Sequence, residues 1–166
     1  MQIIFMSAIR IGHGYDVHAL ITGDGLILGG VNIPCDYALV AYSDGDVVIH
    51  ALCDALLGAM GLGDIGIRFP DSDADNENRD SREFLLHVKS LMDTTSRRLV
   101  NADVTIIAQT PKMAPHIQLM KEIIASDLKA KITSINIKAT TTEKLGFIGR
   151  EEGIAVHAVV LLEKNA

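Results

Sequence analysis

Apolar and polar residues alternate along several short stretches of the chain, and elsewhere apolar residues recur at helical spacing. Alternation with β-branched residues predicts strands, and recurrence every three or four positions predicts helices. On this basis we expect strands at 9–19, 26–33, 101–109, 134–140 and 154–162, and helices at 47–60, 80–99 and 115–128. The last strand is apolar nearly throughout, which predicts burial on both of its faces.

Residues typical of turns and helix caps lie within or at the ends of these stretches. Gly29-Gly30 lies at the centre of 26–33, which is typical of a hairpin or a bulged strand. Ser43 precedes Asp46 by three residues, so this segment resembles a capping box that starts the following helix. A glycine-rich segment at 61–63 ends that helix, and residues 141–143 turn into a short helical piece.

The mixture of strands and helices predicts an α+β fold, a two-layer α/β sandwich in which helices cover one face of a mixed β-sheet. The 166 residues suit one domain, and no linker, repeat or low-complexity tract interrupts them. We therefore expect a single domain at 9–166, preceded by an extension at 1–8 that carries no predicted function.

Composition narrows the classes of function. The 15 basic and 21 acidic residues give a net charge of −6, which argues against a broad surface for nucleic acid or for an anionic membrane. No stretch is long enough for a transmembrane span. The cysteines, Cys35 and Cys53, form no CxxC pair, which favours a reduced, cytoplasmic protein. An acidic chain that binds phosphates needs metal ions, local lysines or backbone N–H groups.

Two pairs of residues have the chemistry of a metal site. Asp16 and His18 are two residues apart on a predicted strand, so both side chains point to one face. His50 and Asp54 share a helix face, and an aspartate near a ligating histidine can fix its tautomer. One carboxylate and two imidazoles suit catalytic zinc, although either pair alone arises by chance more often. His13 competes as a ligand, but its strand parity differs and two glycines flank it, so we expect it to shape the backbone or a loop.

Two further segments could bind a phosphorylated ligand. Thr140 to Thr142 offer hydroxyls and backbone N–H groups at a strand-to-helix turn, and Glu143 adds a carboxylate for a hard cation. The plainer interpretation is helix capping by Thr142. Residues 109–113 end a strand in a proline turn, where Lys112 could meet a phosphate or could simply be solvated.

Two segments match known motifs in part, but the neighbouring elements or residues do not fit those motifs. Residues 61–66 match G-x-G-x-x-G, but they follow a helix and open no long helix, so a dinucleotide site is excluded. Asp71, Asp73 and Asp75 resemble the start of an EF-hand loop, but Asn76 replaces its glycine and Arg82 its final glutamate.

Several longer motifs occur in order between residues 9 and 162. They are GHGYDVH at 12–18, SDGD at 43–46, HAL at 50–52, DALLG at 54–58, GDIG at 63–66, FPD at 69–71, DVTIIAQ at 103–109, PKM at 111–113 and the segment 138–150. Motifs of this length in this order are highly specific. Together they resemble the family of 2-C-methyl-D-erythritol 2,4-cyclodiphosphate synthases, over nearly the whole chain.

The resemblance implies a homotrimer whose sheets face the three-fold axis. It implies that 4-diphosphocytidyl-2-C-methyl-D-erythritol 2-phosphate binds between neighbouring subunits and yields the cyclic diphosphate and CMP. By the same resemblance Asp16, His18 and His50 bind Zn²⁺ or another divalent cation. Glu143 matches the ligand of a Mg²⁺ or Mn²⁺ ion that also contacts the substrate diphosphate.

The resemblance also implies the substrate contacts and the groups that assist the reaction. Tyr42 and Thr141 match the positions that steady the phosphates during the reaction. The cytidine diphosphate pocket of the adjacent subunit matches Ala108 through Ala114 and Thr140 through Thr142. The full set of implied substrate contacts is Asp16, Val17, His18, Tyr42, Ser43, Asp64, Ile65, Gly66, Phe69, Asp71, Asp73, Ala108, Pro111, Lys112, Met113, Ala114, Thr140, Thr141, Thr142, Glu143, Phe147 and Arg150.

Within this set, Asp64 and Gly66 match the groups that hold the erythritol hydroxyls. Phe147 and Arg150, with Glu152, match positions that line a central cavity of the trimer, where family members can hold an isoprenoid diphosphate.

One position departs from the family pattern, because Tyr42 stands where the family usually has a histidine. Two other classes of function stay open at this point. A mononuclear zinc hydrolase would explain the aspartate and the two histidines but not the threonine turn. A trimeric module that binds a nucleotide or an isoprenoid without catalysis would explain the turn but not the metal ligands.

Overall fold

The computed structural model describes residues 9–70, 72 and 76–165. Its elements, in chain order, are β1 (Ile9–Thr22), β2 (Leu26–Leu28), β3 (Val31–Ile33), β4 (Tyr37–Leu39), α1 (Val47–Met60), α2 (Ile65–Arg68), α3 (Ser81–Thr94), β5 (Arg97–Ile107), α4 (Ile117–Asp127), the 3-10 helix η2 (Ile132–Ser134), β6 (Ile135–Thr140), α5 (Gly146–Gly149) and β7 (Gly153–Lys164).

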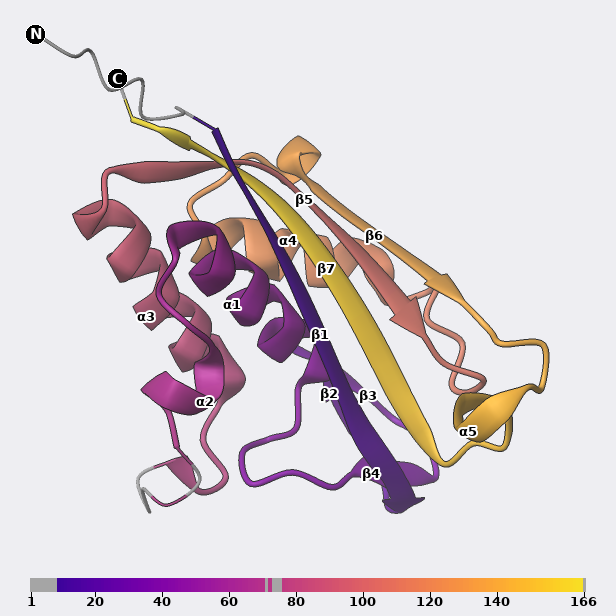
Figure 1. Cartoon of the computed structure of the whole chain (residues 1–166). Coiled ribbons are helices and arrows are strands. Elements are labelled where there is room, and N and C mark those ends of the chain that lie inside the picture. Colours follow the sequence, from indigo (N-terminus) through magenta and orange to yellow (C-terminus); the bar gives the residue numbers. More distant parts are fainter. Residues whose placement is uncertain (1–8, 71, 73–75, 166) are drawn as a thin grey trace, which may run out of the picture.

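The main sheet has five strands in the order β4-β1-β7-β5-β6. β1 and β7 pair antiparallel, as do β7 and β5, whereas β5 and β6 pair parallel. Figure 1 shows β1 and β7 crossing the molecule side by side, with α1, α3 and α4 on one face of the sheet. The predicted α+β fold with a mixed sheet is therefore confirmed.

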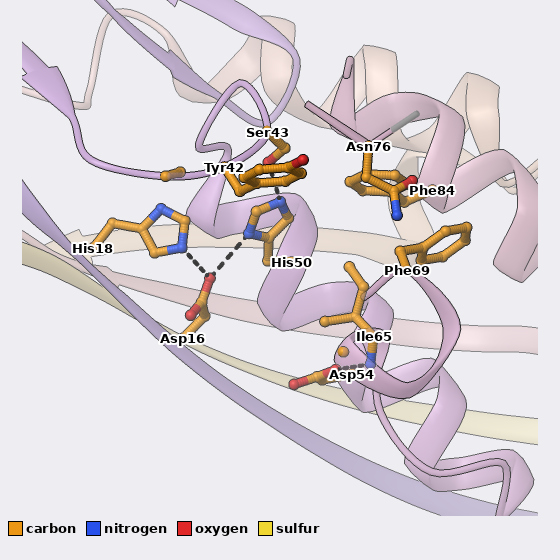
Figure 2. A pocket seen from close by; sticks show the side chains of 12 residues that line it. Asp16, His18, Tyr42, Ser43, His50, Asp54, Ile65, Phe69, Asn76 and Phe84 are labelled. Atoms are coloured by element: carbon orange, nitrogen blue, oxygen red, sulfur yellow. Dashed lines mark hydrogen bonds and ion pairs between the residues drawn. The ribbon is translucent and has the colours of Figure 1, made fainter. Parts of the chain in front are cut away.

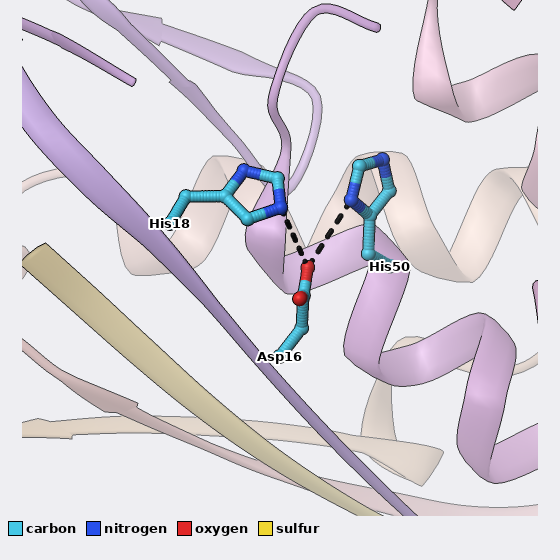
Figure 3. Close-up of side chains that lie close together, drawn as sticks. All are labelled: Asp16, His18 and His50. Atoms are coloured by element: carbon cyan, nitrogen blue, oxygen red, sulfur yellow. Dashed lines mark hydrogen bonds and ion pairs between the residues drawn. The ribbon is translucent and has the colours of Figure 1, made fainter. Parts of the chain in front are cut away.

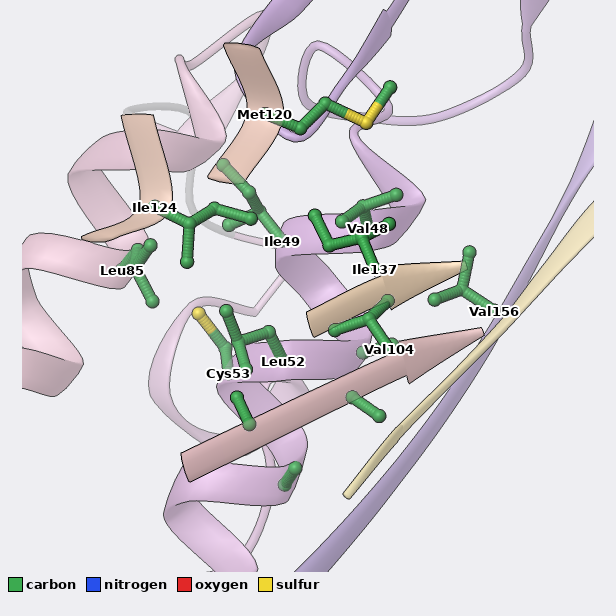
Figure 4. Close-up of a cluster of buried hydrophobic side chains, with 14 of the residues drawn as sticks. Val48, Ile49, Leu52, Cys53, Leu85, Val104, Met120, Ile124, Ile137 and Val156 are labelled. Atoms are coloured by element: carbon green, nitrogen blue, oxygen red, sulfur yellow. The ribbon is translucent and has the colours of Figure 1, made fainter. Parts of the chain in front are cut away.

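α1 is the central helix of the core and is buried on most of its surface. It lies unusually close to β1, because a Cβ added to Gly14 would sit 1.9 Å from the carbonyl oxygen of Ala51. Around it the side chains of three helices and three strands interlock (Figure 4). The labelled members are Val48, Ile49, Leu52, Cys53, Leu85, Val104, Met120, Ile124, Ile137 and Val156.

The caps of α1 differ in part from the prediction. The N-cap is Asp46, whose carboxylate accepts from the backbone N–H groups of Val48 and Ile49, so the predicted capping role of Ser43 is wrong. Ser43 lies too far upstream, and its hydroxyl faces His50 instead. At the other end Gly61 adopts the left-handed conformation, with φ of 73°, and stops the helix as expected.

The second long helix is shorter than predicted. It ends at Thr94 rather than near residue 99, and the chain reverses at Ser96, whose φ is 53°. β5 then begins at Arg97, four residues earlier than expected, because Arg97 to Leu99 pair with the C-terminal part of β7. That pairing joins residues more than sixty positions apart, and local helical spacing carries no sign of it.

β7 is buried along one face, but its opposite face is buried only at the start of the strand, where Ala155 is 1% exposed. The prediction of burial on both faces is therefore wrong for most of the strand. Val156, Ala158 and Val160 face the helices and are at most 1% exposed. Val159, on the opposite face, is 44% exposed. An apolar strip along β1 and β7 is therefore left open to solvent in this chain.

Several other elements lie close to their predicted positions, whereas the short elements β4, α2 and η2 were not predicted. β2 and β3 form the expected hairpin across Gly29-Gly30, where both residues have positive φ. α4 and β6 begin within two residues of the expected starts. Among the helices of the described part of the chain, none combines the length and apolar character needed to cross a membrane.

Candidate metal centre and active site

Asp16, His18 and His50 bring three potential metal ligands to one point (Figure 3). Oδ2 of Asp16 lies 3.0 Å from Nε2 of His18 and 3.2 Å from Nδ1 of His50. The ligand atoms all lie within 4.8 Å of one another. This arrangement confirms that the strand pair and the helix histidine form one group that could hold a metal ion.

Local structure explains how these side chains meet. Asp16 and His18 alternate with outward-facing residues of β1, so both point toward α1. The absence of a side chain at Gly14 lets α1 approach β1 at Ala51, the residue that follows His50. The close packing of helix on strand therefore sets the distance between His50 and Asp16.

The charge of Asp16 suits a cation. Burial alone would raise the pKa of this carboxyl group, but hydrogen bonds and charge interactions with His18 and His50 outweigh burial and hold its pKa far below the usual range. The carboxylate thus stays ionised at neutral pH. One carboxylate oxygen and two imidazole nitrogens match the three protein ligands of a catalytic zinc site, which leaves a further position open.

A second layer of polar groups surrounds His50. Its Nε2 lies 2.8 Å from Oγ of Ser81 and 3.2 Å from Oγ of Ser43. The Ser81 hydroxyl and backbone N–H both donate to the carboxylate of Asp44. Sequence reasoning missed Ser81 and Asp44 as partners of the site, because they are 37 residues apart and form no local motif.

Asp54 does not contribute in the expected way. It was predicted to fix the tautomer of His50, but its Oδ1 accepts a 2.8 Å hydrogen bond from the backbone N–H of Ile65. Burial raises the pKa of Asp54, and this hydrogen bond only partly offsets the effect. Its role in the structure is to hold the start of α2 beside α1, so the predicted pairing is wrong.

The three ligands line one side of a cavity of about 270 Å³ (Figure 2). Among the predicted substrate contacts, Tyr42, Ser43, Ile65, Gly66 and Phe69 line the same cavity. Other lining residues are Ala41, Asp54, Asn76 and Phe84, of which Asn76 and Phe84 had no sequence signal. Several residues that were predicted to contact the erythritol and phosphate groups of the substrate thus lie beside the metal ligands.

Some predicted contacts lie apart from this cavity. Asp64 caps α2 by accepting from the N–H of Ile67 at 2.9 Å. Val17 points to the opposite face of β1 and is 40% exposed. Asp71 and Asp73 lie outside the described residues.

A second cavity, of about 300 Å³, lies where β5 and β6 end. It is lined by Ala108, Gln109, Pro111, Lys112, Met113, Ala114, Ala139, Thr140 and Thr141. Parallel pairing of the two strands brings the proline turn beside the threonine turn, and the N–H of Ala108 donates to the carbonyl of Thr140. The two cavities share no lining residue.

The threonine hydroxyls make hydrogen bonds within their own turn. Thr141 donates to Glu143 at 3.0 Å, and Thr142 donates to the carbonyl oxygen of Leu145 at 2.6 Å. α5 has Leu145 as its N-cap and no side-chain cap, so the interpretation that Thr142 caps this helix is wrong. Glu143 is exposed and has a φ of 52°, which presents its carboxylate at the surface of the turn.

Phe147, Arg150 and Glu152 cluster at the surface near the start of β7. Arg150 forms a two-pronged ion pair with Glu152, with both N–O distances at 2.9 Å, and Phe147 is 41% exposed. His13 was expected to shape the backbone or a loop, and it lies within β1 on the exposed face. Its Nε2 is 3.0 Å from Nδ1 of His157, so the loop alternative is wrong.

Known proteins are similar to this chain in both sequence and structure. The family model described as the YgbB family matches residues 9–163. The 2-C-methyl-D-erythritol 2,4-cyclodiphosphate synthase of Ectopseudomonas mendocina is 63% identical over 155 residues, which span 93% of this chain and 99% of that protein.

Solved structures agree with this assignment. The bifunctional IspDF of Campylobacter jejuni superposes with a TM-score of 0.90 at 46% identity, over 94% of this chain and 42% of that longer chain. IspF of Plasmodium falciparum, solved as a CDP complex, superposes with a TM-score of 0.86 at 34% identity, over 96% and 98% of the two chains. The match of sequence and fold shows that the chain belongs to the YgbB family of 2-C-methyl-D-erythritol 2,4-cyclodiphosphate synthases.

Proposed function

We propose that the chain converts 4-diphosphocytidyl-2-C-methyl-D-erythritol 2-phosphate into 2-C-methyl-D-erythritol 2,4-cyclodiphosphate and CMP, in the non-mevalonate pathway to isoprenoids. Such an enzyme is a phosphorus–oxygen lyase. The observation that carries the proposal is the convergence of Asp16, His18 and His50 beside a cavity in a chain whose relatives are named cyclodiphosphate synthases.

The chemistry asks little of the protein beyond positioning. The 2-phosphate of the substrate attacks its own β-phosphorus, and CMP leaves, so no protein nucleophile is needed. Phosphoryl transfer of this kind depends on alignment and on neutralising the charge of the phosphates. Because the chain itself carries a net charge of −6, divalent cations held by its carboxylate and imidazole groups would supply much of the neutralising positive charge.

Two metal sites are proposed. Asp16, His18 and His50 would hold a zinc ion or a similar divalent cation, and their donor atoms suit it. Glu143 would hold Mg²⁺ or Mn²⁺ together with the substrate diphosphate, because its exposed carboxylate stands beside the threonine turn.

Protein groups around the two cavities would orient the substrate. Tyr42 and Thr141 would steady the phosphates, and Lys112 would meet the diphosphate beside the cytidine. At the start of α2, Asp64 and the backbone of Gly66 would hold the erythritol hydroxyls. The cytidine moiety would bind in the cavity at the ends of β5 and β6, where the proline and threonine turns meet.

We further propose that the active protein is a homotrimer whose sheets face the three-fold axis. Ile11, Tyr15 and Val159 form part of an open strip on β1 and β7, with 71%, 46% and 44% exposure. A surface of this kind favours burial against copies of the same chain. The separation of the two cavities within one chain supports sites that take the metal ligands from one subunit and the cytidine pocket from its neighbour. Phe147 and Arg150 would then line an axial cavity suited to an isoprenoid diphosphate.

We also propose that the enzyme works in the cytoplasm. Cys35 and Cys53 are both free thiols in the structure. Thiols that are not paired are typical of a reducing compartment.

Incubation of the purified protein with the cytidyl substrate and a divalent cation tests the reaction. Phosphorus NMR should show CMP and a cyclic diphosphate appearing together, and a chelator should stop both. A zinc hydrolase would release linear products without the cyclic one, and a binding module would leave the substrate unchanged. The variant His50→Ala serves as the control, since it should lose the metal and the reaction.

A further inference from the structure

His50 is held from both sides of its ring. Nδ1 faces Oδ2 of Asp16 at 3.2 Å, inside the metal group. Nε2 faces away from that group, toward Oγ of Ser81 at 2.8 Å. Ser81 is fully buried and lies at the first position of α3, so its hydroxyl is fixed by the fold rather than by solvent.

The hydrogen positions along this path follow from the partners. The Ser81 hydroxyl has one hydrogen, and its Oγ lies within hydrogen-bonding distance of Oδ1 of Asp44. The backbone N–H of Ser81 donates to the other oxygen of Asp44 at 3.0 Å. A carboxylate can only accept, so the hydroxyl donates to Asp44 and turns its lone pairs toward His50. Nε2 of His50 must therefore carry a hydrogen and donate it to Ser81.

This assignment fixes the other ring nitrogen. A neutral imidazole with its hydrogen on Nε2 has a lone pair on Nδ1. That lone pair points at the Asp16 carboxylate, which is also an acceptor. Two acceptors that face each other at 3.2 Å need a cation or a hydrogen between them. In the metal-free protein a hydrogen on Nδ1 can fill that place, and a metal ion bound to Asp16, His18 and His50 would replace it.

We propose that Ser81 and Asp44 are positioning residues that hold His50 in its metal-binding tautomer and orientation, and so raise the affinity of the site for a divalent cation. The proposal rests on the proposed function for the role of Asp16, His18 and His50 as metal ligands. Hydrogen-bond partners of a metal-binding histidine typically raise metal affinity about 10- to 100-fold, because they fix the orientation and the tautomer of the ring.

Asp44 is well placed for this task. Its Oδ1 also accepts from the backbone N–H of Asp46 at 3.1 Å, and its own N–H donates to the carbonyl of Arg79 at 3.1 Å. The carboxylate is therefore tied to the start of α1 and, through Ser81, to the start of α3. The hydrogen bonds from Asp44 through Ser81 to His50 therefore connect α1 and α3 to the three metal ligands.

Ser43 offers a matched comparison on the same nitrogen. Its Oγ lies 3.2 Å from Nε2 of His50, which is 0.4 Å farther than Oγ of Ser81. It accepts from the N–H of Gly45 at 3.3 Å, and no carboxylate is seen behind it among the described residues. A hydroxyl without such an anchor can turn its own hydrogen toward either side, so it does not define the tautomer.

The test compares Ser81→Ala with Ser43→Ala. Zinc affinity is measured by competition with a chromophoric chelator, without substrate. Ser81→Ala should weaken zinc binding roughly 10- to 100-fold, whereas Ser43→Ala should change it by less than about three-fold. Equal zinc affinity for Ser81→Ala and the parent protein would overturn the proposal, as would equal losses for the two variants.

Nitrogen NMR of the histidine side chains in the metal-free protein, at a pH high enough for the rings to be neutral, reads the tautomer directly. His50 should carry its hydrogen on Nε2 in the parent and in Ser43→Ala, and should populate both tautomers in Ser81→Ala. An unchanged tautomer in Ser81→Ala contradicts the proposal even if zinc affinity falls, because a purely structural effect would then explain the loss.

Asp44→Asn keeps the test valid if Ser81→Ala fails to fold, because the amide preserves the size of the side chain. It should lower zinc affinity by a similar factor. Where Ser81→Ala does fold, combining the two substitutions should add little further loss, since both act through one path. Neither measurement uses the nucleotide substrate. A parent protein that binds zinc in this way but forms no cyclic product would refute the proposed function and leave this inference standing.

Discussion

Asp46 accepts a 2.8 Å hydrogen bond from the backbone N–H of Gly29, seventeen residues earlier in the chain. The same carboxylate accepts from Gly30 at 2.7 Å and from Val48 and Ile49 at 3.1 and 3.0 Å. It therefore caps α1 and anchors the β2–β3 hairpin at once. Asp46 is fully buried, so its removal would leave four buried backbone N–H groups without their acceptor.

Replacing Asp46 by Ala should destabilise the fold far more than replacing Asp80, the N-cap of α3. Asp80 is exposed and accepts one backbone bond, from Arg82. We expect Asp46→Ala to lower the free energy of unfolding by about 2–4 kcal/mol and Asp80→Ala by about 0.5–1 kcal/mol. Urea unfolding of both variants measures the difference. Similar losses would show that the bonds to the hairpin contribute little.

Gly14→Ala should separate α1 from β1. The added methyl group would lie 1.9 Å from the carbonyl oxygen of Ala51, so helix and strand must move apart. We expect a loss of about 3 kcal/mol or more in the free energy of unfolding, together with weaker metal binding, because His50 moves with the helix. Gly58→Ala is the matched control on α1.

A methyl group at Gly58 meets nothing within 4 Å. Alanine there should stabilise the helix by roughly 0.5–1 kcal/mol and leave metal binding unchanged. Thermal unfolding and a zinc titration of both variants suffice. A well-folded Gly14→Ala protein with the zinc affinity of the parent would refute the close-packing argument.

Asp103 should make stability depend on pH. Lys138 Nζ lies 2.6 Å from both of its carboxylate oxygens, and Asn136 donates at 2.7 Å. These hydrogen bonds, that of Lys138 foremost, lower the pKa of Asp103 below its ordinary value. A carboxyl group whose pKa is lower in the folded state stabilises the fold above its unfolded pKa, about 4. That contribution is lost as the pH falls below this value.

Asp103→Asn should therefore be less stable than the parent at pH 7, by under about 1 kcal/mol because the pair is partly exposed. The gap should shrink at pH 3 and in 1 M salt, where the parent loses the same interaction. Urea midpoints at the two pH values measure it. A gap that stays constant with pH would assign the effect to packing rather than to charge.

Mixed trimers test whether the sites are shared. His50→Ala removes the metal ligand of one cavity, and Lys112→Ala alters the other, so each variant alone should be inactive. In random one-to-one mixtures about one quarter of the subunit contacts carry neither lesion, if each contact is the head-to-tail kind found in cyclic trimers. Activity should recover to about that level. Mixed trimers verified by mass spectrometry that stay inactive would argue against sites built between subunits.

Tyr42 tests the departure from the family histidine. It lines the metal cavity, and its neutral hydroxyl can donate one hydrogen bond to a phosphate, where a histidine can donate as a cation. We expect Tyr42→Phe to slow turnover several-fold, equivalent to about 1 kcal/mol. Tyr42→His should not be slower than the parent and should show a new pH dependence between about 6 and 7.

Tyr37→Phe is the control for Tyr42→Phe. It removes a hydroxyl that bonds to Glu151 at 2.7 Å, outside both cavities, and should leave turnover unchanged. If Tyr42→Phe turns over as fast as the parent across the pH range, the Tyr42 hydroxyl has no part in the reaction. Neither the fold nor the metal ligands depend on that outcome.

Local patterns predicted the parts of the site that lie on one element. Strand parity placed Asp16 and His18 on one face, and helical spacing placed His50 on the buried side of α1. The hairpin at Gly29-Gly30 followed from turn chemistry alone. These features depend only on residues that are close in sequence, so they can be predicted from one sequence.

Features that depend on distant partners were missed. The bonds from Ser81 to Asp44 and to His50 join separate helices, and no local spacing encodes them. The early start of β5 depends on pairing with β7, and the open face of β7 depends on what covers the sheet. In each case local sequence preferences are compatible with several structures, and tertiary contacts determine which of these structures forms.

The alternation along β1 has a consequence for how this protein can evolve. Asp16 and His18 face inward, whereas Tyr15 and Val17 face outward on the open strip. Point substitutions can therefore remodel the outer face while the metal ligands stay in place. A single inserted or deleted residue in this strand, however, would exchange the two faces and present the ligands to the outside. Lineages of this protein should thus accept apolar replacements on the outer face of β1 more readily than changes in the length of the strand.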